Sequence, residues 1–269
     1  MIPAEQIQQN WDRLIQVIEH YIKDDRKDEL ISLYNDHKER IMMAPASAKN
    51  WHHSAFPGGY VDHILRVVKG ALKLQNLWTE MGTVDDSYTE EELVFAAINH
   101  DLGKIGYDQD NAEYYVPNDS DWHIKNLGQV YKYNTNIPSM KVPDRSLFLL
   151  QSRGIKVTEN EFLAIKLHDG IYDEANKFYY MAGQKETRLR THLPLLLHHA
   201  DHMASQIEFE MWVENNPFND IQRAKAKPSN ASKADKTLRK AKAIKAENNP
   251  RLTSATLGVI DSFFNDDDE

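Results

Sequence analysis

The sequence holds a compact group of residues suited to metal chemistry. His100-Asp101 is followed three positions later by Lys104, so an imidazole, a carboxylate and an ammonium group stand close together. An imidazole and a carboxylate can bind the same cation, and the two oxygens of a carboxylate can bridge two cations. His63 lies upstream of this pair and Asp201 lies downstream. These residue types predict a divalent metal site built from distant segments, with Asp101 and Lys104 as candidate catalytic residues.

Composition restricts what can bind the metal. The chain has 269 residues, of which 41% are hydrophobic and none is cysteine. Without thiolates, a metal must be held by His, Asp and Glu, and such mixed ligands suit Mn, Mg, Fe, Ni or Co. No stretch approaches the roughly 20 apolar residues of a membrane-spanning helix. We therefore expect a cytoplasmic protein that makes no membrane contact.

The net charge of −9 is unevenly distributed. Residues 221–251 contain ten Lys or Arg and two acidic residues, about +8, which leaves about −17 for the rest of the chain. An acidic body argues against a broad nucleic-acid track, which needs many phosphate contacts. We expect N-terminal helices in residues 1–45, a catalytic domain in residues 46–215 and a charged, basic C-terminal tail in residues 216–269.

Apolar spacing predicts an all-α fold. Apolar residues recur at helical steps over residues 7–22 and 30–42, which predicts an N-terminal helical hairpin packed on the domain. A helix over residues 60–78 places His63 near its first turn. The helix that leads to His100 is expected to begin at Thr89, with Glu92 as its capping-box partner.

Two later helices carry further candidates. A helix over residues 159–168 ends in His168, and a strongly apolar helix over residues 193–213 contains Asp201. A carboxylate in such an apolar segment is costly to bury unless it is paired or bound to a metal.

The connecting segments are richer in polar and aromatic residues. Residues 105–145 are expected to be irregular around one short helix over residues 121–133. Residues 171–190 are expected to form a lid or a short hairpin over the site.

The order His63, His100-Asp101, Asp201 on separate helices resembles the HD-domain metal-dependent phosphohydrolases. Residues 53–63 resemble the approach to the first histidine of HD-type 3′-5′ exoribonucleases. The resemblance covers roughly residues 50 to 205. It implies an HD-domain helical bundle in which these four residues bind a divalent metal.

The resemblance also implies further ligands and substrate contacts. Family members with a second metal add histidines between the HD pair and the last Asp, and His123 and His168 occupy matching places, so one or two ions are expected. The HD-type 3′-5′ exoribonucleases usually have two consecutive histidines where this chain has His168-Asp169. Expected substrate contacts are His53, Arg66, Lys104 and Arg188.

We therefore expect a nucleotidase or phosphodiesterase that hydrolyses a phosphate ester of a nucleotide or short oligonucleotide with a metal-activated water. Two alternatives remain within the same fold, a 3′-5′ exoribonuclease-like phosphodiesterase on single-stranded nucleic acid and a nucleotide-binding sensor. A purely structural helical protein is a third possibility.

Overall fold

The computed structural model describes residues 2–23, 25–52, 54–83, 87–110 and 112–216. The chain divides into two units, Met1–Glu210 and Met211–Glu269. The predicted basic tail lies outside the described residues, apart from its first residue, Asn216. His53 also lies outside them.

The described part of the chain is mostly helical, which confirms the all-α prediction. Its α-helices are α1 (Ala4–Tyr21), α2 (Lys27–Asp36), α3 (Lys38–Met43), α4 (Gly59–Glu80), α5 (Glu90–Asn99), α6 (Asp121–Leu127), α7 (Val142–Ser152), α8 (Glu159–Leu167), α9 (Lys177–Tyr180) and α10 (Leu193–Glu214). Two short strands, β1 (Tyr115–Pro117) and β2 (Tyr131–Tyr133), pair in antiparallel orientation.

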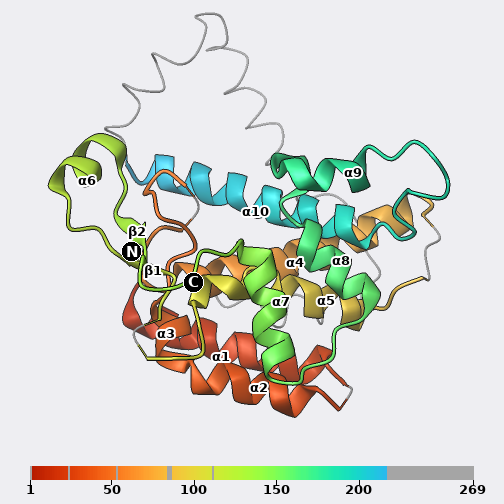
Figure 1. Cartoon of the computed structure of the whole chain (residues 1–269), viewed down its shortest axis with the longest axis horizontal. Coiled ribbons are helices and arrows are strands. Elements are labelled where there is room, and N and C mark those ends of the chain that lie inside the picture. Colours follow the sequence, from red (N-terminus) through yellow and green to blue (C-terminus); the bar gives the residue numbers. More distant parts are fainter. Residues whose placement is uncertain (1, 24, 53, 84–86, 111, 217–269) are drawn as a thin grey trace, which may run out of the picture. The chain divides into compact units, whose positions relative to one another are not determined.

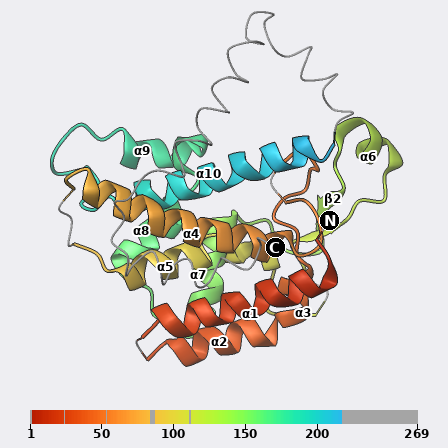
Figure 2. The same cartoon turned by 180° about the vertical axis from the view of Figure 1, so that it is seen from behind.

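Helices α4 and α5 run through the middle of the first unit. Helices α1 and α2 lie on one side of them, and the N-terminal half of α10 lies on the other (Figures 1 and 2). Leu14, Ile64 and Phe95, from α1, α4 and α5, are all fully buried. Burial of each such side chain contributes about 1.5–3 kcal/mol. This core fixes the two helices that carry His63 and His100.

Gly70 allows α10 to approach α4 closely. A Cβ atom at Gly70 would lie 2.9 Å from Met203 Cε and 3.7 Å from Ala200 Cβ. Gly70 is seven residues after His63, so both lie on one face of α4. The close approach therefore holds the Asp201 region of α10 against the face of α4 that carries His63.

The helix predicted over residues 30–42 is divided in the structure. Helix α2 ends before His37 and α3 begins after it, with the His37 backbone at φ −111° and ψ 17°. The His37 ring is buried, and its Nε2 lies 3.0 Å from Asp108 Oδ1. This contact with a segment distant in sequence accompanies the break, and helical spacing alone could not predict it.

The helix predicted over residues 121–133 ends early. Helix α6 stops at Leu127, because Gly128 turns the chain in the left-handed conformation at φ 55°. A Cβ atom at Gly128 would lie 2.4 Å from Trp51 Cζ3, so the turn requires glycine. The last three residues of the predicted helix form β2 instead.

Two other connecting segments differ from expectation. The irregular region ends before residue 145, because α7 begins at Val142 with Pro143 in its first turn. Instead of a hairpin, residues 171–190 contain short helical turns, including 3-10 turns at Gly170–Tyr172 and Glu174–Asn176. The described residues of this segment include no strand.

Candidate metal centre

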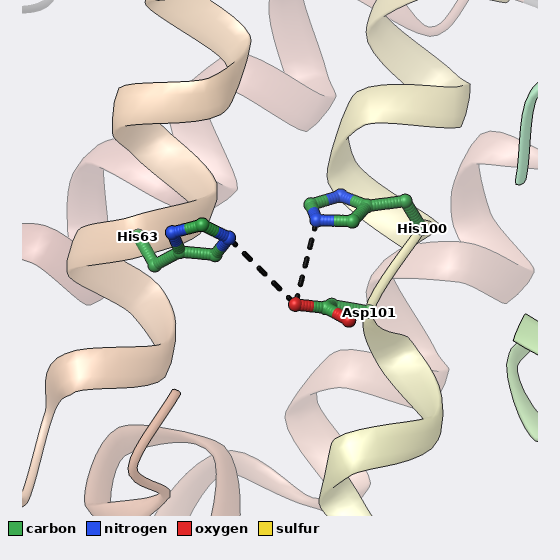
Figure 3. Close-up of side chains that lie close together, drawn as sticks. All are labelled: His63, His100 and Asp101. Atoms are coloured by element: carbon green, nitrogen blue, oxygen red, sulfur yellow. Dashed lines mark ion pairs between the residues drawn. The ribbon is translucent and has the colours of Figure 1, made fainter. Parts of the chain in front are cut away.

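Three candidate ligands meet where α4 passes the end of α5. His63 projects from the first turns of α4, and His100-Asp101 follow the last residue of α5 (Figure 3). Asp101 Oδ2 lies 3.7 Å from His63 Nε2 and 3.4 Å from His100 Nε2. All three residues are buried.

Asp201 and His168 complete the cluster. Asp201 Oδ1, from α10, lies 3.1 Å from His63 Nε2 and 3.9 Å from His100 Nε2. His168 follows α8, and its Nε2 lies 3.7 Å from Asp101 Oδ1. The possible ligand atoms of His100, His168 and Asp201 lie within 4.8 Å of one another, as do those of His63, His100 and Asp101. The structure thus brings five of the six predicted ligands together, and this buried group could hold a metal ion.

His100 and His168 are oriented in the same way. Each directly follows a helix that begins with a threonine capping box. The Nδ1 of His100 donates to Ala97 O at 2.8 Å, and the Nδ1 of His168 donates to Ile165 O at 2.8 Å. Because a carbonyl oxygen only accepts, Nδ1 carries a proton in both rings, and Nε2 of each ring is the nitrogen that faces the cluster.

Nε2 of His100 faces carboxylate oxygens. His100 Nε2 is buried and makes no hydrogen bond with any described residue, although oxygens of Asp101 and Asp201 lie within 3.9 Å. An unprotonated nitrogen opposite carboxylates is unfavourable in a buried site unless a cation compensates. Imidazole nitrogens and carboxylate oxygens are common ligands of divalent metals, so the donor set fits such an ion.

The charges in the cluster are strongly coupled. Burial alone lowers the pKa of His63, but the carboxylates of Glu208 and Asp201 together raise it to about 10. Burial alone raises the pKa of Asp201, but the ring of His63 and the neighbouring histidines hold it well below its usual range. In the absence of a metal, a proton on His63 therefore compensates these carboxylates.

Lys104 lies where the cluster opens to a pocket. Its Nζ lies 2.5 Å from Asp101 Oδ2. Burial raises the pKa of Asp101, but Lys104 and His100 hold it well below its usual range. The pocket has a volume of about 430 Å³ and is lined by Asp101, Lys104, Lys141, Val142, Pro143, His168, Asp169, Tyr172, Asp173 and Asp201.

The charge of this pocket links anion binding to the metal. Four aspartates and two lysines line it, and these six side chains carry a net charge of −2. One divalent ion would neutralise the pocket, and two would make it positive. An anion is therefore disfavoured in this pocket unless a cation is also present.

The structure does not bring His123 to this cluster. His123 is exposed on α6, and its Nδ1 lies 2.7 Å from the hydroxyl oxygen of Ser120, which also caps this helix. It belongs to neither group of possible ligands among the described residues. Its place in the sequence order resembled a ligand position, but α6 lies at one end of the first unit (Figure 1).

The predicted substrate contacts are also dispersed. Arg66 donates to Glu208 and to Asp62, each at 3.2 Å. Arg188 is exposed and lines a separate pocket of about 660 Å³ that contains none of the cluster residues. Of the predicted substrate contacts in the described part, Lys104 is the one that borders the cluster.

Sequence reasoning missed several residues around the cluster. Glu208 lies 3.0 Å from His63 Nδ1 and is nearly fully buried. Helical spacing could have predicted this position, because Glu208 is seven residues after Asp201 and so lies on the same face of α10. Lys141 and Asp173 also line the pocket. Tertiary packing brings them there, so their spacing in the sequence did not predict this position.

Comparisons of this chain with protein-family models, with curated proteins and with solved structures find no match. Among the described helices, none has both the length and the apolar character needed to cross a bilayer.

Proposed function

We propose that this protein is an HD-type metal-dependent phosphohydrolase that acts on a phosphate ester of a nucleotide or of a short nucleic-acid end. One observation carries the proposal. A group of three histidines and two aspartates, in which Nε2 of His63 and of His100 faces carboxylate oxygens, opens directly onto a pocket bordered by Lys104.

The ligand roles follow from which atoms face one another. His63, His100, Asp101 and Asp201 would hold one divalent ion. His168 lies near the other oxygen of Asp101, so these two residues would take part in a second site. A bound divalent ion supplies a water that is nucleophilic near neutral pH and neutralises charge on the phosphate.

Lys104 would contribute a fixed positive charge to the substrate pocket. Burial alone lowers the pKa of Lys104, but Asp101 raises it above its ordinary value. The ammonium group therefore stays protonated at neutral pH, at a position where it can attract a phosphate oxygen as a point charge. Its contact with Asp101 ties this charge to the ligand set.

Pocket size and charge favour a small substrate. A volume of about 430 Å³ lies within the usual range for small-molecule sites. One observation favours a longer substrate, because Lys104 also borders a second cavity of about 1360 Å³ that includes Tyr115 and Tyr131. Aromatic side chains can stack on nucleic-acid bases, so an exoribonuclease-like phosphodiesterase is the second candidate.

The test is a screen of mononucleotides and short single-stranded oligonucleotides with Mn, Mg, Ni and Co, using protein whose metal content has been measured. We expect metal-dependent release of phosphate or of a mononucleotide. A salt titration of substrate affinity separates the candidates, because a polymer that contacts several phosphates loses affinity steeply with salt. Protein that binds none of these metals would contradict the proposal.

A further inference from the structure

We infer that Glu208, held by Arg66, is a positioning residue that orients His63 towards the metal centre. The inference rests on the proposed function, because Glu208 acts through a proposed metal ligand. It does not depend on which phosphate ester is the substrate.

His63 differs from the other two histidines in its place on its helix. His100 and His168 follow the ends of α5 and α8, where the last carbonyl groups lack partners within the helix and can accept from a ring nitrogen. His63 lies in the first turns of the 22-residue helix α4. Carbonyl groups there accept from amides of the next turn, so His63 needs a partner from another element.

Glu208 is that partner. Its Oε1 and Oε2 lie 3.0 and 3.2 Å from His63 Nδ1, and the glutamate is 5% exposed. An ionised carboxylate only accepts, so the proton of this hydrogen bond lies on Nδ1. The other ring nitrogen, Nε2, then faces Asp201 Oδ1 at 3.1 Å.

Helix α10 therefore places a carboxylate beside each nitrogen of the His63 ring. Asp201 and Glu208 are seven residues apart on α10, which places them two turns apart on the same face. Asp201 lies at the nitrogen that faces the cluster, and Glu208 lies at the opposite nitrogen. This arrangement fixes both the tautomer and the direction of the ring.

Arg66 fixes the glutamate in turn. Its Nε donates to Glu208 Oε1 at 3.2 Å, and its Nη2 donates to Asp62 Oδ2 at 3.2 Å. The guanidinium group offsets the negative charge of a nearly buried carboxylate. Carboxylate partners of metal-binding histidines raise ligand basicity, and their loss typically weakens metal binding about 10- to 100-fold.

The experiment compares Glu208→Gln with Glu210→Gln in the full-length protein, because Glu210 is exposed on the same helix. Mn²⁺ affinity is measured by calorimetry, and the absorption spectrum of bound Co²⁺ reports the ligand field. We expect Glu208→Gln to weaken Mn²⁺ binding about 10- to 100-fold and to change the Co²⁺ spectrum, and Glu210→Gln to match the wild type. Glu208→Asp should recover part of the affinity.

The outcomes separate this inference from the proposed function. If the wild type binds no metal, the proposed function fails. If the wild type binds Mn²⁺ and Glu208→Gln binds it equally well, only the inference fails. Should Glu208→Gln not fold, as judged by circular dichroism, Arg66→Met carries the test, with several-fold weaker Mn²⁺ binding expected and wild-type binding overturning the inference.

Discussion

Two charged clusters are buried in the same helical unit, and they are built differently. In the first, Arg26 makes a bidentate ion pair with Glu161, with both nitrogen–oxygen distances at 2.6 Å. Arg26 also donates to Lys156 O at 2.7 Å, and its guanidinium group lies 3.9 Å from the centre of the Phe95 ring. In this cluster the guanidinium group binds a carboxylate and a carbonyl oxygen, and none of the residues named here lines any of the three pockets described above.

The metal cluster has the opposite character. It brings together possible ligand atoms from three histidines and two aspartates, with Lys104 in contact with Asp101, and it opens onto a pocket. Burial is similar in the two clusters, so burial alone does not distinguish a structural ion pair from a binding site. The balance of donors and acceptors does. The closed cluster, around Arg26 and Glu161, pairs a cation with a carboxylate, whereas the open cluster, around Asp101, presents a set of atoms that could hold a cation.

The largest expected difference between the clusters is in catalysis. Asp101→Asn keeps the size of the side chain but removes the charge that offsets the cation. We expect a loss of turnover of several kcal/mol in activation free energy, roughly a thousandfold. Steady-state assays with saturating Mn²⁺ measure this effect.

A stability measurement accompanies the assay. Asp101→Asn should fold, and Mn²⁺ should no longer raise its melting temperature. Near wild-type turnover in this variant would contradict the role of Asp101.

A substitution in the closed cluster should lower the free energy of unfolding and leave metal affinity unchanged. Burial raises the pKa of Glu161 despite the opposing effects of Arg26 and the Thr158 amide, so the ion pair works against a desolvation cost. Glu161→Gln leaves a buried guanidinium group without its carboxylate. We expect a loss of about 3–5 kcal/mol in the free energy of unfolding, measured by urea denaturation, with unchanged Mn²⁺ affinity. A large change in metal affinity would show that the clusters are coupled.

Metal binding at the open cluster should raise the free energy of unfolding by an amount that depends on pH. Mn²⁺ at 100 times its dissociation constant should add about 2.7 kcal/mol to the free energy of unfolding. The folded pKa of His63 is about 10, above its ordinary value of 6.5. In metal-free protein, the stability from protonated His63 is thus fully present below pH 6.5 and is lost as the pH rises through 10.

A metal must displace this proton, so the stabilisation by Mn²⁺ should increase between pH 6.5 and 8. Thermal melts across this range, with and without Mn²⁺, measure the trend. Stabilisation that decreased with pH would contradict the competition between proton and metal at His63.

Much of the fold could be predicted because helix periodicity and capping are local. The expected capping box of Thr89 and Glu92 is present at the start of α5. The break at His37 and the turn at Gly128 were missed, because each accompanies close packing against a distant segment, Asp108 in one case and Trp51 in the other. Such tertiary contacts override local spacing.

The candidate site could likewise be predicted only where local sequence patterns mark its residues. His100 was recognisable because it follows a capped apolar helix, and Asp201 because it interrupts an apolar one, whereas His168 was assigned from its place in the sequence order. His123 was assigned from sequence order alone, and order does not set distance when the connecting elements are short and irregular. Glu208 was not predicted, although it lies seven residues after Asp201 and shares a face of α10 with it.

The smallest expected effect concerns Glu91, at the edge of the closed cluster. Glu91 Oε1 lies 3.6 Å from Arg26 Nη2, beyond hydrogen-bond distance, and the Glu91 side chain is 23% exposed. If Glu161 already satisfies the guanidinium group, the Glu91 charge adds little. We therefore expect Glu91→Gln to change the free energy of unfolding by less than about 1 kcal/mol, measured by urea denaturation beside Glu161→Gln. Equal losses in the two variants would mean that Arg26 depends on both carboxylates. The Arg26–Glu161 pair alone would then not balance the charges of this cluster, and its contrast with the metal centre would no longer hold.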